Sequence, residues 1–347
     1  MPSNFLLYGA NGFVGREIAR LAVKKGLRPI LAGRHRASVE WIAAELGLEH
    51  RVFDLDHVAI DNVAAVLHCA GPYLHTWKPM VDACLARGVH YLDITGEIPV
   101  YEAIAARGDE AKSRRVMLLP GVGFDVVPTD CLAVHLKRRL SSATHLTLAF
   151  QALGRAGLPP GTQRTMIEMI PFGDRVRRDG KLVAPDERVS TRSVDFGRGP
   201  VLATRLTWGD VFTAYHSTGI PNIEDYAVLP PSMRKQMALV SRIRFLFKLP
   251  PVRKLLERGV KPGSTPEQRA QTSTHVWGEV VDGRGGRATA RLHGPEAGVV
   301  WTSETALAAV RRVLAGDVRP GFQTAGAAYG PDFVLETPGV TREDVAA

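Results

Sequence analysis

The stretch that decides the fold reads Phe5-Leu6-Leu7-Tyr8-Gly9-Ala10-Asn11-Gly12-Phe13-Val14-Gly15. An apolar run leads into three glycines, and the glycines lead into a segment whose apolar residues recur with helical spacing up to Gly26. This order predicts a strand, a tight turn and a helix. Gly9 permits the turn, Gly12 lets the backbone approach a pyrophosphate, and Gly15 lets the helix pack on the sheet. We therefore expect the helix N-terminus to hold a dinucleotide.

Outward from this loop, the first third of the chain alternates short apolar runs with helical periodicity. Such alternation is the signature of βαβ units and a parallel sheet. Strands are expected at 4–8, 28–32, 51–53, 64–68, 90–93 and 116–119, and helices at 13–25, 38–46, 75–87 and 100–113. Six strands in this rhythm predict an α/β Rossmann domain, with a doubly wound parallel sheet, over residues 1–130.

The pattern changes after residue 124. Strand-like runs at 144–150, 189–196, 201–208, 275–281 and 286–293 follow one another with few helices, which are expected at 129–140, 162–170, 231–247 and 302–314. Consecutive strands favour antiparallel pairing. The sequence thus predicts a C-terminal α+β domain with a mostly antiparallel sheet over residues 131–310.

Composition and charge limit the possible classes of protein. The 347 residues suit two domains, with 45% hydrophobic and 23% charged residues. Three cysteines form no CxxC pair, and no apolar run approaches the length of a membrane span, so we expect a cytoplasmic protein with reduced thiols. Nine of the cations lie between Arg234 and Lys261, opposed there only by Glu257. Neither nucleic-acid motifs nor metal-ligand spacings accompany them, so we expect a small-molecule partner, no nucleic acid and no metal.

The end of the second strand indicates which cofactor binds. It reads Leu31-Ala32-Gly33-Arg34-His35-Arg36, with no acidic residue before Glu40 to hold a ribose 2′-hydroxyl. Arg34, supported by Arg36, suits a 2′-phosphate instead, so the expected cofactor is NADP(H). The candidate cofactor-binding residues, taken from the ends of the first four strands, are Gly9, Asn11, Gly12, Phe13, Val14, Gly15, Gly33, Arg34, Arg36, Asp54, Ala70, Gly71 and Pro72.

Several motifs together resemble the saccharopine dehydrogenase-like family, and most closely its trans-acting enoyl reductases. They are the glycine loop, Ala32-Gly33-Arg34, Ala70-Gly71-Pro72-Tyr73, the run 88–97 and the run 120–130, with thinner matches later. The resemblance implies an N-terminal NADP domain, a C-terminal substrate and dimerisation domain, a homodimer, and a last segment, 311–347, that folds back on the Rossmann domain. The chain departs from the family's pattern at His75-Thr76-Trp77-Lys78, where members often carry Tyr-Gly.

Hydride transfer also needs a proton donor or an anion stabiliser beside the acceptor. The catalytic candidates are Tyr73, His75 and Asp125, on loops expected at the carboxyl edge of the sheet; Asp125 could equally cap the helix that follows it. Lys78, Asp130 and His216 are further candidates, with Asp130 and His216 favoured as structural residues. No tyrosine has a lysine four residues later, which disfavours a short-chain dehydrogenase.

We expect an NADPH-dependent reductase of a conjugated carbon–carbon double bond on a hydrophobic or lipid-like substrate. Two alternatives remain open: an imine or secondary-amine oxidoreductase of the saccharopine dehydrogenase type, and a non-catalytic NADP sensor. The basic, apolar segment 232–258 is consistent either with peripheral contact to a membrane or with a subunit interface.

Overall fold

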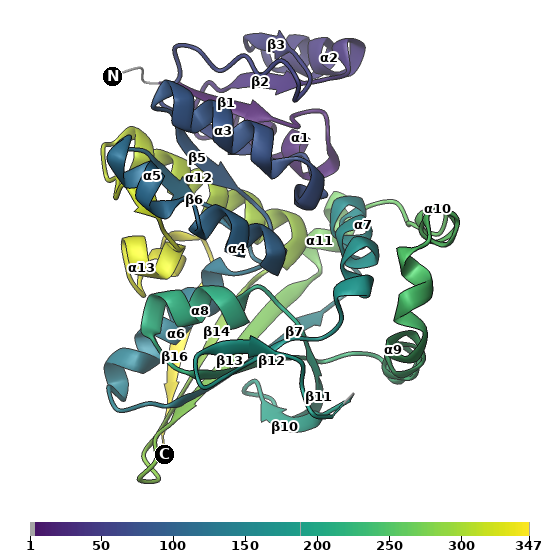
Figure 1. Cartoon of the computed structure of the whole chain (residues 1–347), viewed down its shortest axis with the longest axis vertical. Helices are drawn as coiled ribbons and strands as arrows, with labels where there is room; N and C mark the ends of the chain where they lie inside the picture. Colours follow the sequence, from purple (N-terminus) through teal and green to yellow (C-terminus); the bar gives the residue numbers. More distant parts are fainter. Residues whose placement is uncertain (1–3, 188, 347) are drawn as a thin grey trace. The chain divides into compact units, whose positions relative to one another are not determined.

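The computed structural model describes residues 4–187 and 189–346, and its chain forms two compact units. Unit 1 comprises Met1–Val127 and Gly298–Ala328, and unit 2 comprises Pro128–Ala297 and Tyr329–Ala347 (Figure 1). Each unit is built around its own sheet.

Unit 1 contains a seven-stranded, wholly parallel sheet in the order β15-β6-β5-β4-β1-β2-β3. Its first six strands have the doubly wound order predicted from the sequence, so the Rossmann fold is confirmed. The seventh strand comes from far along the chain and was not predicted. The strands are β1 (Phe5–Tyr8), β2 (Ile30–Gly33), β3 (His50–Val52), β4 (Ala65–His68), β5 (His90–Asp93), β6 (Met117–Leu119) and β15 (Gly321–Phe322).

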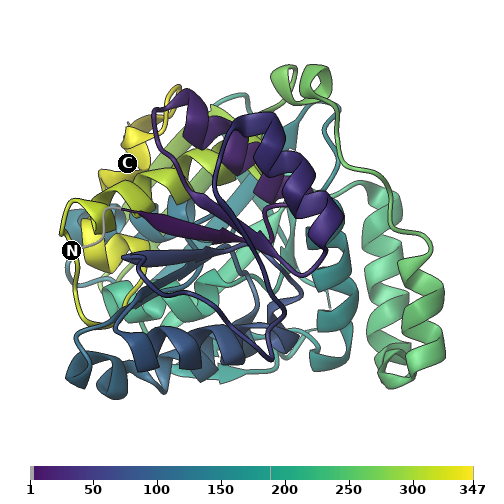
Figure 2. The same ribbon diagram turned by 90° about the horizontal axis from the view of Figure 1, so that it is seen from above.

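Helices cover both faces of this sheet, as right-handed crossovers require (Figure 2). On one face α12 lies beside α1, where Lys25 and Glu304 form an ion pair of 2.5 Å. The single helix expected at 100–113 is interrupted around Arg107, just before the buried Gly108, because glycine weakens a helix interior. The helices and turns are α1 (Phe13–Lys24), α2 (Arg36–Leu46), η1 (Tyr73–His75), α3 (Trp77–Arg87), α4 (Ile98–Ala105), α5 (Gly108–Ser113), α12 (Thr302–Leu314) and α13 (Ala325–Tyr329).

Unit 2 contains a nine-stranded mixed sheet. Among the described strands of this sheet, only β12 and β7 pair in parallel, so the expectation of a mostly antiparallel sheet is confirmed. The strands are β7 (His145–Leu153), β8 (Val176–Arg178), β9 (Lys181–Val183), β10 (Thr191–Asp195), β11 (Pro200–Leu206), β12 (Asn222–Ala227), β13 (Ser273–Val281), β14 (Arg287–Pro295) and β16 (Thr341–Val345).

Gly278 in β13 lets a helix approach this sheet closely, because a Cβ atom there would lie 2.7 Å from Leu136 of α6. The helix expected at 231–247 ends earlier, at Ile243, and continues as a 3₁₀ turn. The helices and turns are α6 (Val127–Arg139), α7 (Pro160–Met169), η2 (Ile170–Phe172), α8 (Asp210–Thr218), α9 (Pro231–Ile243), η3 (Arg244–Lys248), α10 (Pro250–Glu257), α11 (Pro266–Ala270) and η5 (Phe333–Glu336). A further turn, η4 (Ala297–Trp301), spans the boundary at Gly298, and most of it belongs to unit 1.

The last part of the chain was expected to pack on the Rossmann domain as one segment, 311–347, but the structure divides it between the two units. The chain returns to unit 1 at Gly298, and residues 329–347 belong to unit 2. The physical reason is backbone pairing, because β16 forms an antiparallel ladder with β14. Within the described residues, no helix is long and apolar enough to cross a membrane, and the three cysteines are free thiols.

Candidate cofactor and active site

Two glycines shape the loop between β1 and α1. Gly9 has φ of +83°, and a Cβ atom there would lie 2.8 Å from the Cys69 carbonyl carbon. A Cβ atom on Gly15 would lie 2.2 Å from the Gly9 carbonyl oxygen. Both positions are therefore closed to any side chain by backbone atoms, and they hold the helix N-terminus against the end of the strand.

Gly12 occupies a different environment, at the N-cap of α1 with φ of −74°. Among described atoms, a Cβ atom there would approach only the Gly9 carbonyl oxygen, at 3.1 Å. The side of Gly12 that faces away from the loop is thus open. Phe13 and Val14 follow in the first turn of α1, and the N–H groups of a first helical turn point out of the end of the helix. An open cradle at a helix N-terminus fits the pyrophosphate of a dinucleotide.

Asn11 connects this cradle to the end of β2. Its side-chain Nδ2 donates to Ser38 Oγ at 3.2 Å, and a Cβ atom on Gly33 would lie 2.9 Å from its Oδ1. Residue 33 therefore has to be glycine, because the Asn11 side chain fills the space that a Cβ atom on residue 33 would need. The predicted residues Asn11 and Gly33 lie next to each other in the structure.

The two arginines beyond β2 differ in their partners. Arg36 forms an i,i+4 ion pair with Glu40 at 3.0 Å. Arg34 is exposed, and its Nε lies 3.1 Å from the ring Nε2 of His35. Arg34 thus retains terminal guanidinium nitrogens for a 2′-phosphate, whereas Arg36 is engaged by a carboxylate.

Asp54 lies just beyond β3 and closes a turn. Its Oδ1 accepts hydrogen bonds from the Asp56 and His57 amides, both at 3.1 Å, and lies 3.1 Å from the His57 ring. The hydrogen bond to the His57 side chain holds the Asp54 pKa below its ordinary value. These contacts give Asp54 a structural role beside its predicted role in binding the cofactor.

The loop after β4 carries the predicted residues Ala70, Gly71 and Pro72. Thr76 Oγ1 donates to the Ala70 carbonyl oxygen at 2.8 Å and to that of Pro72 at 3.3 Å. The loop is therefore pinned by its own following turn.

The buried carboxylate of Glu97 holds the same loop through hydrogen bonds to its backbone. Glu97 accepts the Tyr73 amide at 2.8 Å and the Leu74 amide at 2.6 Å. Sequence reasoning did not assign this role to Glu97, although it lies in the quoted run 88–97. Two charge-assisted hydrogen bonds of this kind fix the backbone that enters η1.

A second carboxylate, Asp93, joins the ends of β5 and β6. Its Oδ1 accepts the Thr95 and Gly121 amides at 2.9 and 2.8 Å, and its Oδ2 accepts the Tyr91 hydroxyl at 2.7 Å. Burial raises its pKa to about 6. The ring Nδ1 of His68 lies 3.2 Å from the same hydroxyl, and burial lowers the His68 pKa to about 3, so this histidine is neutral.

The predicted catalytic residues Tyr73 and His75 occupy different environments. The Tyr73 hydroxyl is buried and donates to the His68 carbonyl oxygen at 3.2 Å, and burial raises its pKa well above the ordinary value. It therefore supports the loop. His75 is exposed on η1, and the further candidate Lys78 pairs with Asp82 at 2.6 Å.

Asp125, the third predicted catalytic residue, lies on the loop before α6. Its carboxyl group is half-buried against Gly96, where a Cβ atom would lie 3.0 Å from Oδ2. Within the described residues it accepts no hydrogen bond. Burial, with a smaller contribution from the charge of Glu97, raises its pKa to about 7. The preceding amide, of Phe124, donates to Thr302 Oγ1 at 3.1 Å, so a residue from α12 holds this loop.

The remaining candidates, Asp130 and His216, lie in unit 2. Asp130 is buried and accepts a hydrogen bond from Ser217, whereas His216 is exposed on α8. Asp130 is thus part of the packing between α6 and α8.

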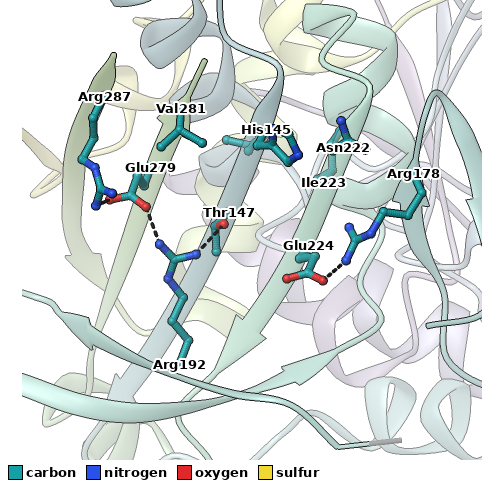
Figure 3. Close-up of a pocket in the computed structure, with 11 residues that line it drawn as sticks. His145, Thr147, Arg178, Arg192, Asn222, Ile223, Glu224, Glu279, Val281 and Arg287 are labelled. Atoms are coloured by element: carbon teal, nitrogen blue, oxygen red, sulfur yellow. Dashed lines mark hydrogen bonds and ion pairs between the residues drawn. The ribbon is translucent and has the colours of Figure 1, made fainter. Parts of the chain in front are cut away.

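A hollow of about 360 Å³ lies over β7, β12 and β13 of unit 2 (Figure 3). Its arginines are opposed by carboxylates: Arg178 pairs with Glu224, and both Arg192 and Arg287 pair with Glu279. The arginines of this hollow are thus engaged in ion pairs with neighbouring carboxylates, and we assign the hollow a structural role.

Comparison with known proteins identifies the first unit. Residues 5–119 match the family model described as "Saccharopine dehydrogenase NADP binding domain". These residues form a domain of that family. The expected resemblance is confirmed for this domain, and its cofactor is NADP(H).

Two curated relatives carry different functional names. The chain is 24% identical to the human "Saccharopine dehydrogenase-like oxidoreductase", over 50% of this chain and 47% of the relative. It is 30% identical to the "Trans-acting enoyl reductase" of Mycobacterium leprae, over 40% of this chain and 36% of the relative. The matches thus span half or less of these relatives.

One solved structure resembles the whole chain. Apo saccharopine dehydrogenase (L-Glu forming) from Saccharomyces cerevisiae gives a TM-score of 0.64 at 13% identity, covering 99% of this chain and 100% of that one. At this identity the likeness establishes the fold. The matched domain and the relatives' names support the expectation of an NADP-dependent oxidoreductase.

Proposed function

We propose that the protein is an NADP-dependent reductase of a carbon–carbon double bond conjugated to a carbonyl, on a hydrophobic substrate. The observation that carries the proposal is Asp125, a carboxyl group that accepts no hydrogen bond from the described residues and has a pKa of about 7. A general acid is most effective when its pKa lies near the working pH. Asp125 meets that condition on the sheet edge where a Rossmann domain binds its ligand.

When bound, NADPH supplies a hydride. Addition of hydride to the β-carbon moves the electron pair of the double bond onto the carbonyl-conjugated α-carbon. That carbon then requires one proton, which Asp125 donates in its neutral form. The donated proton and the hydride together balance the two-electron reduction, and the Asp125 carboxylate is reprotonated from water.

The surrounding residues position this acid. Thr302 holds the Phe124 amide, and Glu97 both anchors the neighbouring loop and raises the pKa of Asp125 by its charge. Glu97 and Thr302 are therefore positioning residues.

Reduction of an imine is the second candidate, favoured by the relatives named saccharopine dehydrogenase-like. A third, a non-catalytic NADP sensor, would bind cofactor without turnover. Oxidation of NADPH with an enoyl thioester, compared with a preformed imine, separates these functions.

The decisive variant is Asp125→Asn, which keeps the shape but cannot donate the proton. We expect enoyl-dependent NADPH oxidation to fall by about 10²–10⁴-fold, the usual contribution of a general acid, with the Kd for NADPH unchanged. In the wild type, activity should fall as pH rises above about 7, because the carboxyl group loses its proton.

The matched control is Asp109→Asn, whose side chain is 96% exposed in the same unit and should keep wild-type kinetics. A variant at Asp125 that retains the rate and the alkaline decline would exclude this acid. Turnover of the imine alone would replace the enoyl assignment.

A further inference from the structure

Exposed apolar side chains are concentrated in one helical region of unit 2. Of the thirteen large hydrophobic residues exposed among the described residues, eight lie in or beside α7, η2, α9, η3 and α10. They are Leu158, Met166, Phe172, Leu239, Phe245, Leu246, Leu249 and Leu255, and we call them, with the cations between them, the basic-apolar face. Phe245 and Leu255 are 63% and 65% exposed.

The helices that carry this face are packed together, so it is one surface. Arg253 of α10 pairs with Glu168 of α7 at 2.8 Å. Gln163 of α7 accepts the Lys261 amide at 2.9 Å. Figure 1 shows α10 beside α7, and η3 contacts both η2 and α9.

Cations are interleaved with the apolar residues. Arg242, Lys248, Lys254 and Arg258 are exposed, and none forms an ion pair with another described residue. Over 234–261 the sequence has nine basic residues and one acidic residue. Unpaired cations beside exposed leucine and phenylalanine side chains are the combination that binds the interface of an anionic bilayer.

The charge also argues against a second copy of this chain as the occupant. In a two-fold interface the same patch faces itself, so the exposed cations Arg242, Lys248, Lys254 and Arg258 would meet the same cations of the other copy. Like charges in contact oppose such an association. An anionic lipid surface instead offers both the opposite charge and an apolar layer.

We propose that the basic-apolar face docks the protein peripherally on an anionic membrane surface. The cations contact lipid headgroups, while Phe245, Leu249 and Leu255 enter the headgroup–acyl boundary. This inference concerns unit 2 and is independent of the reaction proposed above.

Flotation of the full chain with vesicles tests the proposal. Vesicles of phosphatidylserine and phosphatidylcholine in equal amounts should bind the protein, and pure phosphatidylcholine should bind it weakly. Each cation near such a surface contributes about fivefold in binding, so Lys248→Glu/Lys254→Glu should lower binding by on the order of 25-fold or more. Phe245→Ser/Leu255→Ser should also weaken it.

The matched control is Arg155→Glu/Lys181→Glu, which reverses two exposed cations of unit 2 outside this face and should bind like the wild type. All variants should keep the wild-type NADPH affinity and circular dichroism spectrum. Absence of vesicle binding, or binding unchanged by Lys248→Glu/Lys254→Glu, would overturn the proposal. So would conversion of a dimer into a monomer by Phe245→Ser/Leu255→Ser in light scattering, because the face would then be a subunit interface.

Discussion

Arg34 allows the cofactor preference to be tested with an internal control two residues away. Within the described part of the chain, the one hydrogen bond of its guanidinium runs from Nε to the His35 ring, whereas Arg36 is held by Glu40 at 3.0 Å. A charge-assisted hydrogen bond to the 2′-phosphate contributes roughly 1.5–3 kcal/mol. Arg34→Ala should therefore weaken NADPH binding by about ten- to a hundredfold and leave NADH binding unchanged. In the wild type, we expect NADPH to bind at least about tenfold more tightly than NADH.

The Arg36→Ala control removes an exposed side chain already engaged in an ion pair. Exposed pairs contribute about 1 kcal/mol at most, so its effect on the NADPH Kd should be about fivefold or less. Arg34→Asp should abolish or reverse the preference. Quenching of protein fluorescence during titration gives the Kd values. Equal wild-type affinities for the two cofactors, or equal losses in Arg34→Ala and Arg36→Ala, would refute the assignment of Arg34.

Two further predictions concern the glycine loop and the acid. Gly12→Val should remove NADPH binding without lowering the Tm of the apo protein appreciably, whereas Gly15→Ala should lower the Tm, because its Cβ would lie 2.2 Å from the Gly9 carbonyl oxygen. Normal NADPH binding by Gly12→Val would contradict the phosphate site. Glu97→Gln should move the alkaline decline of activity to lower pH, because the charge of Glu97 helps to raise the pKa of Asp125. An unshifted decline would show that the two groups do not interact.

Sequence reasoning was most successful where neighbouring residues determine the structure. The strand, glycine turn and helix of residues 5–24 depend on local periodicity and on glycine's freedom at Gly9 and Gly15, and all of these can be read from consecutive residues. The parallel sheet followed from the repetition of that unit. The NADP(H) cofactor followed from the absence of an acid after β2. The helix expected at 100–113 was only partly right, because it is broken at Ala106 and Arg107, just before Gly108.

Only the tertiary structure decided the contacts between distant parts of the chain. No local pattern indicates that β15 extends the first sheet, that Thr302 holds the Phe124 amide, or that residues 341–345 pair with β14. Asp125, Tyr73 and His75 were all predicted as catalytic residues because each lies on a loop expected at the carboxyl edge of the parallel sheet. The structure distinguished them, because a pKa depends on burial and on neighbouring charge. Those depend on which segments pack together, and the packing of distant segments is a property of the folded chain.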